Sequence, residues 1–201
     1  MKKTILLNLI FLLNLTALSS QNIDYQILKD LNKYQSPSDN RFNQFISDAA
    51  APLSIGTPLV MFGVGLIQKN EDLKSKGIQT GIAFALTLGE TVALKYIVNR
   101  PRPYITYPDL KNLTTEESPS FPSGHSSSVF SIATSLSLNY PKWYVIVPAY
   151  MWAAATGYSR MYLNVHYPSD VLVGALLGSG TAWLTWKLNK ELQKKKGGNV
   201  N

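Results

Sequence analysis

The feature that most constrains the fold is a series of apolar runs separated by short polar or proline-containing segments. The runs cover residues 49–67, 77–98, 129–138, 143–158 and 171–186. None of them alternates apolar and polar residues with the two-residue period of a half-buried strand, and their lengths are typical of helices. The sequence therefore predicts an all-α fold, a helical bundle with about five core helices.

The two ends of the chain differ from these runs. The N-terminus has Lys2 and Lys3, then an apolar run, then small residues, as in a signal peptide; a first transmembrane helix is the alternative. The predicted organisation is a signal peptide or first transmembrane helix over residues 1–20, a polar exported segment over 21–47, the helical domain over 48–188 and a lysine-rich, frayed cytoplasmic tail over 189–201.

The polar segment over residues 21–47 has two interpretations. Apolar residues recur at helical spacing in it (Ile23, Ile27, Leu28 and Leu31), which would suit a short amphipathic helix. We favour a solvated surface segment, because most of its other residues are polar. The sequence Ser36-Pro37-Ser38 is expected to interrupt any helix that forms there.

The placement of charge favours a membrane location. The runs over residues 49–67 and 77–98 are long enough to cross about 30 Å of hydrocarbon, whereas the later three are shorter. If the chain crosses repeatedly, the lysines between runs and in the tail fall on the cytoplasmic side, as the positive-inside tendency requires. Residues 99–122 and 159–170 then lie together at the periplasmic face of the inner membrane. A soluble periplasmic bundle is the alternative.

Composition narrows the chemistry further. The 201 residues include no cysteine, which excludes disulfides and thiolate metal sites, and only two histidines, which argues against a histidine-rich metal site. The formal net charge of +7 suggests anionic partners: nucleic acid, acidic lipid or a phosphorylated substrate. Nucleic acid is disfavoured, because the basic tail would lie against the cytoplasmic membrane surface.

The first of three motif-like stretches is KYIVNRPRP, residues 95–103. Lys95 lies near the end of an apolar run, where a buried ammonium group is costly without a partner. It could simply extend to the membrane interface, with no further role. Convergence of Lys95 and Arg102 on one anion would explain both cations. Arg100 is a second candidate, or an anchor at the interface.

The second stretch is PSFPSGHSSS, residues 119–128, which leads directly into a helical pattern. Free backbone N–H groups at a helix start form an anion site, and the glycine at position 124 allows a ligand to approach closely. Ser123 adds a hydroxyl donor, and His125 lies at the mouth of the site. A capped helix with an incidental histidine is the alternative.

The third stretch is SRMYLNVHYPSD, residues 159–170. The planar guanidinium of Arg160 suits phosphate oxygens, and His166 can be a base, an acid or a nucleophile near neutral pH. Pro168 favours a helix start, with His166 on the preceding loop and Asp170 in the first turn. The Asp170 carboxylate could then hold one imidazole nitrogen while the other faces a substrate. A loop with an ordinary ion pair is the alternative.

The three stretches fit the patterns K-x6-R-P, P-S-G-H and S-R-x5-H-x3-D, in that order, over residues 95–170. In these motifs the chain resembles the type 2 phosphatidic acid phosphatase (PAP2) family, which shares its fold with bacterial acid phosphatases and vanadium haloperoxidases. The apolar GALLG that follows Asp170 is more similar to the membrane lipid phosphatases than to the soluble enzymes.

The resemblance implies hydrolysis of a lipid phosphate or diphosphate through a phosphohistidine intermediate. His166 would be the nucleophile, Asp170 would orient it, and His125 would protonate the leaving group. The implied phosphate-binding residues are Lys95, Arg102, Ser123, Gly124 and Arg160. No metal and no cofactor is implied, because three fixed cations are available to neutralise the phosphate.

Several substrates and functions remain open at this point. Undecaprenyl diphosphate, phosphatidate, phosphatidylglycerol phosphate and lipid A phosphates all suit a membrane site. The first alternative is a soluble periplasmic acid phosphatase that acts on small phosphomonoesters. A vanadium haloperoxidase and a non-enzymatic lipid-binding membrane protein are less favoured: the short chain has no additional pocket motifs, and a binding protein leaves both histidines unexplained.

Overall fold

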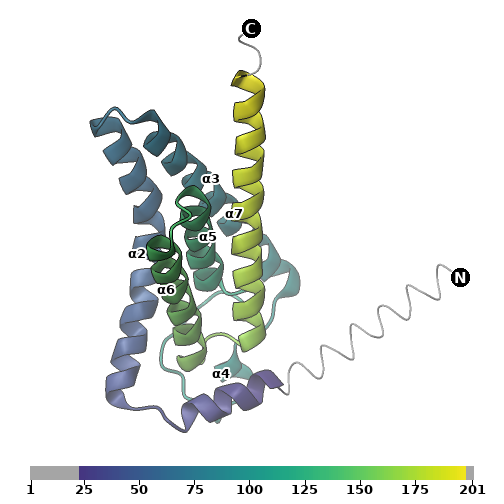
Figure 1. Cartoon of the computed structure of the whole chain (residues 1–201). Helices are drawn as coiled ribbons and strands as arrows, with labels where there is room; N and C mark the ends of the chain where they lie inside the picture. Colours follow the sequence, from purple (N-terminus) through teal and green to yellow (C-terminus); the bar gives the residue numbers. More distant parts are fainter. Residues whose placement is uncertain (1–22, 198–201) are drawn as a thin grey trace, which may run out of the picture.

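The computed structural model describes residues 23–197, and helices make up most of this range (Figure 1). An unlabelled helix covers residues 23–32. The labelled helices are α2 (Pro37–Ile67), α3 (Glu71–Val98), α4 (Pro103–Thr106), α5 (Gly124–Asn139), α6 (Trp143–Tyr162) and α7 (Pro168–Gly197). The predicted all-α bundle with about five core helices is confirmed. The predicted signal peptide or first membrane helix lies outside the described residues.

Helix α5 is the centre of the bundle. It packs against α2, α3, α6 and α7, and α2 and α3 also pack against each other as an antiparallel pair (Figure 1). The buried face of α5 is unusually polar; Ser126, Ser127, Ser131 and Ser135 are fully buried. Small side chains with a hydroxyl group allow two helices to approach closely and to form hydrogen bonds with each other. The hydroxyl groups of Ser127 and Thr91 form such a bond, with 2.8 Å between their oxygens.

Within residues 23–197, three segments are long and apolar enough to cross a membrane: Pro37–Ile67, Glu71–Thr106 and Pro168–Lys194. Their outer surfaces carry exposed large apolar side chains, among them Leu59, Ile82, Val92, Leu172 and Leu184. Such an apolar surface is suited to contact with lipid.

Two helix boundaries differ from the prediction. Helix α2 begins at Pro37, well before the apolar run that starts at residue 49. Helix α7 continues to Gly197, so the tail that was predicted to be frayed is helical over residues 189–197.

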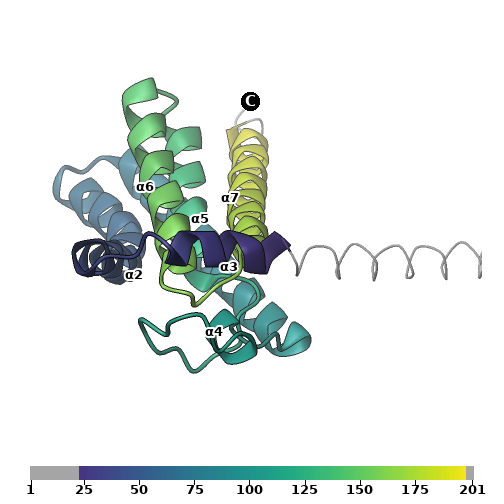
Figure 2. The same ribbon diagram turned by 90° about the horizontal axis from the view of Figure 1, so that it is seen from below.

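The helix over residues 23–32 corrects one interpretation of the sequence. A solvated surface segment was favoured there, but Leu28 is fully buried and packs with Leu110 and Tyr167. Figure 2 shows this helix lying across the ends of α5, α6 and α7. The predicted break after it is confirmed, because Ser36 caps α2 by accepting a hydrogen bond from the Asp39 N–H, and Pro37 occupies the first turn.

The connections fall into two groups at opposite ends of the bundle (Figure 1). One end holds the α2–α3 turn, the α5–α6 turn and the end of α7. The other holds the helix over residues 23–32, α4, the loop over residues 107–123 and the α6–α7 connection. The three sequence motifs therefore meet at a single end of the bundle.

Helix α7 approaches α5 closely enough to require glycine. A Cβ atom at Gly174 would lie 2.7 Å from the backbone oxygen of Ser123, and one at Gly178 would overlap the backbone oxygen of Ser127. Because both obstacles are backbone atoms, the clash cannot be relieved by rotating a side chain. Gly180, two residues further on, faces open space.

We expect Gly178→Ala to destabilise the protein, because the added methyl group forces α5 and α7 apart. Overpacking of this kind costs about 1–3 kcal/mol. Thermal unfolding of the protein in detergent measures the loss. Gly180→Ala is the matched control in the same helix and should leave the melting temperature unchanged or slightly raised. Equal effects of the two substitutions would contradict the packing argument.

Candidate functional site

Three buried cations converge at the end of the bundle where the motifs meet. Lys95 comes from the last turn of α3, Arg102 precedes α4, and Arg160 is in the last turn of α6; their exposed fractions are 8%, 2% and 2%. The Lys95 ammonium donates to the backbone oxygen of Pro119. Arg102 donates through Nε to the Ser118 oxygen at 2.9 Å and through Nη1 to the Val165 oxygen at 2.8 Å.

The N-terminus of α5 opens beside these cations. Ser123 is the N-cap: its Oγ accepts from the Ser126 N–H at 3.3 Å and from the Ser126 hydroxyl at 3.0 Å, so its own hydrogen stays available to donate. A Cβ at Gly124 would be 3.9 Å from Cε of Lys95, an ordinary contact. Gly124 therefore faces Lys95 directly, and the free N–H groups of the first turn add to an anion-binding surface.

His166 lies on the loop before α7, as predicted, with its ring between Arg102 and Asp170. Its Nε2 is 3.5 Å from Arg102 Nη1. Its Nδ1 is 3.6 Å from Asp170 Oδ2, slightly beyond a hydrogen bond, and has no other hydrogen-bond partner among the described residues. Burial lowers the pKa of His166 to about 3, so the ring is neutral at physiological pH and holds a free lone pair.

Asp170 lies in the first turn of α7, as predicted, and is completely buried. Its Oδ2 accepts from the Ser120 hydroxyl and from the Tyr167 N–H at 2.9 Å, while its Oδ1 accepts from Arg100 Nη1 at 2.6 Å. These contacts fix the carboxylate beside the His166 ring and keep it charged in the protein interior.

Arg100 has a larger structural role than the sequence indicated. Besides Asp170, it binds Asp24 through Nη2 at 2.9 Å, and its guanidinium stacks on the Tyr167 ring at 3.7 Å from the centroid. Asp24 also accepts from the Ser169 N–H at 3.0 Å. A chain of contacts thus runs from the helix over residues 23–32 through Arg100 to Asp170. Sequence reasoning did not identify Asp24, although it lies on the same helical face as Leu28 and Leu31.

Glu116 is a second site residue that the sequence did not identify. Its Oε1 accepts from Arg160 Nη2, and its Oε2 is 3.8 Å from Arg102 Nη2. Burial opposes ionisation of this carboxyl group, but the Arg160 and Arg102 cations hold its pKa below the ordinary value. Glu116 and Glu117 are adjacent in a polar loop, and the sequence around them does not indicate which of the two contacts the arginines.

His125, the second residue of α5, completes the group. Burial and the surrounding cations, Arg160 foremost, lower its pKa to about 4, while the Glu116 carboxylate opposes the shift. His125 can therefore act as a proton donor near neutral pH only when an anionic ligand raises its pKa. A doubly charged phosphate group brings that charge.

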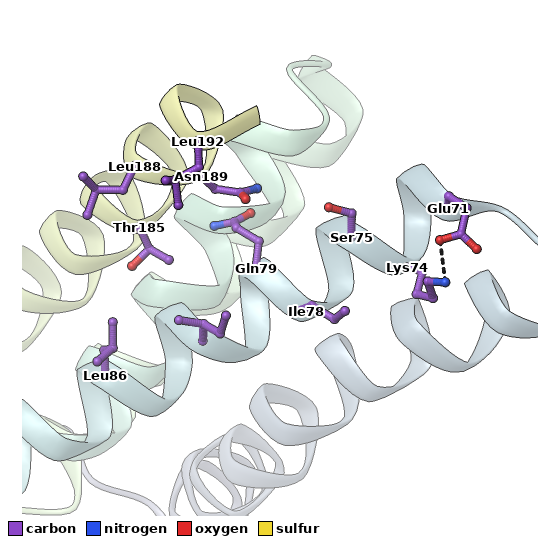
Figure 3. Close-up of a pocket in the computed structure, with 11 residues that line it drawn as sticks. Glu71, Lys74, Ser75, Ile78, Gln79, Leu86, Thr185, Leu188, Asn189 and Leu192 are labelled. Atoms are coloured by element: carbon purple, nitrogen blue, oxygen red, sulfur yellow. Dashed lines mark ion pairs between the residues drawn. The ribbon is translucent and has the colours of Figure 1, made fainter. Parts of the chain in front are cut away.

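A groove whose lining is mainly apolar lies away from this site. It lies between α3 and α7 near the start of α3, lined by residues that include Ile78, Leu86, Leu188 and Leu192 (Figure 3). Its charged residues, Glu71 and Lys74, pair with each other. No motif residue lines it, so we place the chemistry at the other end of the bundle.

We expect Asp24→Asn to lower the stability of the protein, because it leaves the Arg100 cation with less compensation. Breaking a mostly buried ion pair of this kind costs about 2–4 kcal/mol. Chemical or thermal unfolding in detergent measures the change. Asp30→Asn, on the same helix in an exposed pair with Lys33, is the matched control and should have little effect. Equal stability of the Asp24 variant and the parent would show that the network does not support the fold.

Comparison with known proteins shows which family this chain resembles. Residues 77–194 match the model of the PAP2 superfamily. The chain is similar to an undecaprenyl-diphosphatase of Sulfolobus acidocaldarius (39% identity over 54% of this chain and 53% of that protein). It is also similar to a lipid A 1-phosphatase of Porphyromonas gingivalis (26% identity over 82% of this chain and 35% of that protein). The matches thus span about half or less of these relatives.

Two solved structures share the fold over nearly their whole length. The crystal structure of Aquifex aeolicus LpxE superposes with a TM-score of 0.69, at 28% identity, over 81% of this chain and 93% of that one. The first transmembrane PAP2 type phosphatidylglycerolphosphate phosphatase from Bacillus subtilis superposes with a TM-score of 0.72, at 28% identity, over 95% of this chain and 98% of that one. Because the family model covers more than half of the chain and includes all three motifs, the chain belongs to the PAP2 superfamily.

Proposed function

We propose that this protein is a membrane phosphatase that hydrolyses a lipid phosphate or diphosphate through a phosphohistidine intermediate. The observation that carries the proposal is the convergence of three buried cations, Lys95, Arg102 and Arg160, at the end of the bundle that holds a neutral, buried His166, whose Nε2 is 3.5 Å from Arg102 Nη1. Cations in a low-dielectric site neutralise a phosphoryl group and leave its phosphorus open to attack. The names of the similar proteins, an undecaprenyl-diphosphatase and lipid A phosphatases, support the same class of substrate.

In the first step, the Nε2 lone pair of His166 forms a bond to phosphorus while the bond from phosphorus to the leaving oxygen breaks. His125 gives its proton to that oxygen, so the alcohol or phosphate leaves without building up charge. The Asp170 carboxylate, beside Nδ1, stabilises the positive charge that develops on the His166 ring. In the second step, water attacks the phosphohistidine, His125 takes the water proton, and His166 is released.

The other site residues hold the oxygens of the transferred group. Lys95, Arg102 and Arg160 compensate their charge, and the Ser123 hydroxyl and the Gly124 N–H donate from the start of α5. These groups occupy fixed positions on four different parts of the fold. Such positioning and charge neutralisation supply most of the catalysis in phosphoryl transfer.

A lipid is the substrate that suits this position in the fold. The site lies at one end of helices that are long enough to span a membrane, with exposed apolar side chains along them (Figure 1). A phosphorylated headgroup can enter from the interface while its hydrocarbon chain stays in the bilayer. A small soluble ester would gain nothing from that surface.

We expect the purified protein to release phosphate from a panel of lipid phosphates and diphosphates in the presence of chelator, and vanadate to inhibit it. Activity on p-nitrophenyl phosphate should be much weaker. His166→Ala should abolish turnover, because it removes the nucleophile. The variant should still be folded, as shown by a thermal unfolding transition. Lipid phosphatase activity close to that of the parent in this variant would rule out His166 as the nucleophile, and no release from any lipid would refute the proposed activity.

The site end of the bundle is proposed to face the periplasm. The opposite end carries Lys69, Lys74, Lys76 and Lys142, and a positive end is the one that stays in the cytoplasm. The chain has no cysteine, so single cysteines can report on each end. Asn112, in the loop at the site end, and Lys142, in the α5–α6 turn, are both exposed.

We expect a membrane-impermeant maleimide to label Asn112→Cys in intact cells and to label Lys142→Cys only after the cells are opened. Labelling efficiency on a denaturing gel measures both. The reverse pattern would place the site in the cytoplasm and refute this orientation.

A further inference from the structure

The cations assigned to substrate phosphate already bind an anion from the protein's own chain. Glu116, in the loop between α4 and α5, accepts a hydrogen bond from Arg160 and lies 3.8 Å from Arg102 through its other oxygen. Its side chain is 27% exposed, whereas both arginine side chains are 2% exposed. The carboxylate therefore caps the two guanidinium groups on their solvent side.

The remaining contacts of the two arginines do not compensate their charge. Arg160 donates to the Ser47 hydroxyl, and Arg102 donates to the backbone oxygens of Ser118 and Val165 and, through Nη2, to the Ser118 hydroxyl at 3.2 Å. Among the residues that the structure describes, Glu116 provides the only carboxylate within ion-pair distance of either arginine. A buried cation without a counter-charge is strongly disfavoured, and this carboxylate compensates one of the two positive charges of the pair.

A carboxylate and a phosphate make the same kind of contact with arginine. Each presents two oxygens that accept charge-assisted hydrogen bonds from a guanidinium group. Arg160 cannot donate the same Nη2 hydrogen to Glu116 and to a phosphate oxygen at the same time. Glu116 also lies beside Arg102 Nη2, 3.8 Å away, where a phosphate bound to both arginines would have to sit. Binding of the one anion therefore competes with binding of the other.

We propose that Glu116 is an internal competitor for the phosphate subsite, which partly compensates the charge of Arg102 and Arg160 until a substrate phosphate displaces it. That the displacing group is a phosphate rests on the proposed function. Glu116 then sets how tightly the site binds phosphate. Its displacement also frees a loop whose backbone oxygens at Ser118 and Pro119 bind Arg102 and Lys95, so substrate binding is coupled to the position of this loop.

A different role for Glu116 would have the opposite consequence. If the carboxylate served only to orient the two arginines for phosphate, its removal would weaken phosphate binding. If it is a competitor, its removal strengthens binding, because the fraction of protein with free arginines rises. The sign of the change in affinity distinguishes the two roles.

The test measures the dissociation constant of inorganic phosphate by titration calorimetry on the full chain in detergent. Glu116→Gln keeps the size of the side chain and removes its charge. If Glu116 occupies the arginines for about nine-tenths of the time, the variant should bind phosphate about tenfold more tightly. Glu117→Gln is the matched control: this neighbouring glutamate is exposed and forms no ion pair in the described residues, so its loss should change the constant less than twofold.

Unchanged or weaker phosphate binding in Glu116→Gln would overturn the proposal, as would equal tightening in the Glu117 control. Should the glutamine variant fail to fold, Glu116→Asp provides the same test, because a shorter carboxylate cannot reach both arginines and should also bind phosphate more tightly than the parent. The measurement needs no turnover. Tighter phosphate binding in a protein that hydrolyses no lipid phosphate would support the competitor and refute the proposed activity, so the two outcomes are separable.

Discussion

Three positive charges buried at one end of a helical bundle are the constraint on which the rest of the structure depends. Lys95, Arg102 and Arg160 repel one another, and burial removes the water that would otherwise screen them. The fold compensates with backbone oxygens of the loop before α5, with the Val165 oxygen and with the Glu116 carboxylate. A site that needs this much compensation is already shaped for an anion with several oxygens.

The same end of the bundle holds the proposed nucleophile, His166, whose surroundings are fixed from several directions. The His166 ring lies between Arg102 and Asp170, and Asp170 is in turn held by Ser120, the Tyr167 N–H and Arg100. Arg100 also reaches Asp24, far away in the sequence. The geometry of the proposed catalytic pair thus depends on a helix that lies outside the matched family region of residues 77–194.

The glycines and hydroxyl residues of the bundle serve this arrangement. Gly174 and Gly178 bring α7 against α5, and this contact carries the start of α7, with Asp170, to the start of α5, with Ser123. The Ser123 N–H donates to the Asp170 backbone oxygen at 3.1 Å, which joins the two helix starts directly. Close helix packing in the bundle and alignment of the site are therefore one structural feature. Small residues at the contact allow the two helices to pack this closely in an apolar environment.

The sequence by itself determined the helical class, the main helices and the motif residues that we propose as the site, because apolar periodicity and motif spacing are local properties. It placed His166 on a loop and Asp170 in the first turn of a helix from Pro168 alone. Only the tertiary structure decided which polar residues outside the motifs join the site. Asp24 and Glu116 resemble ordinary surface acids in the sequence, and what distinguishes them is an arginine brought near by folding. Long-range charge pairing leaves no local pattern, so a single sequence does not reveal it.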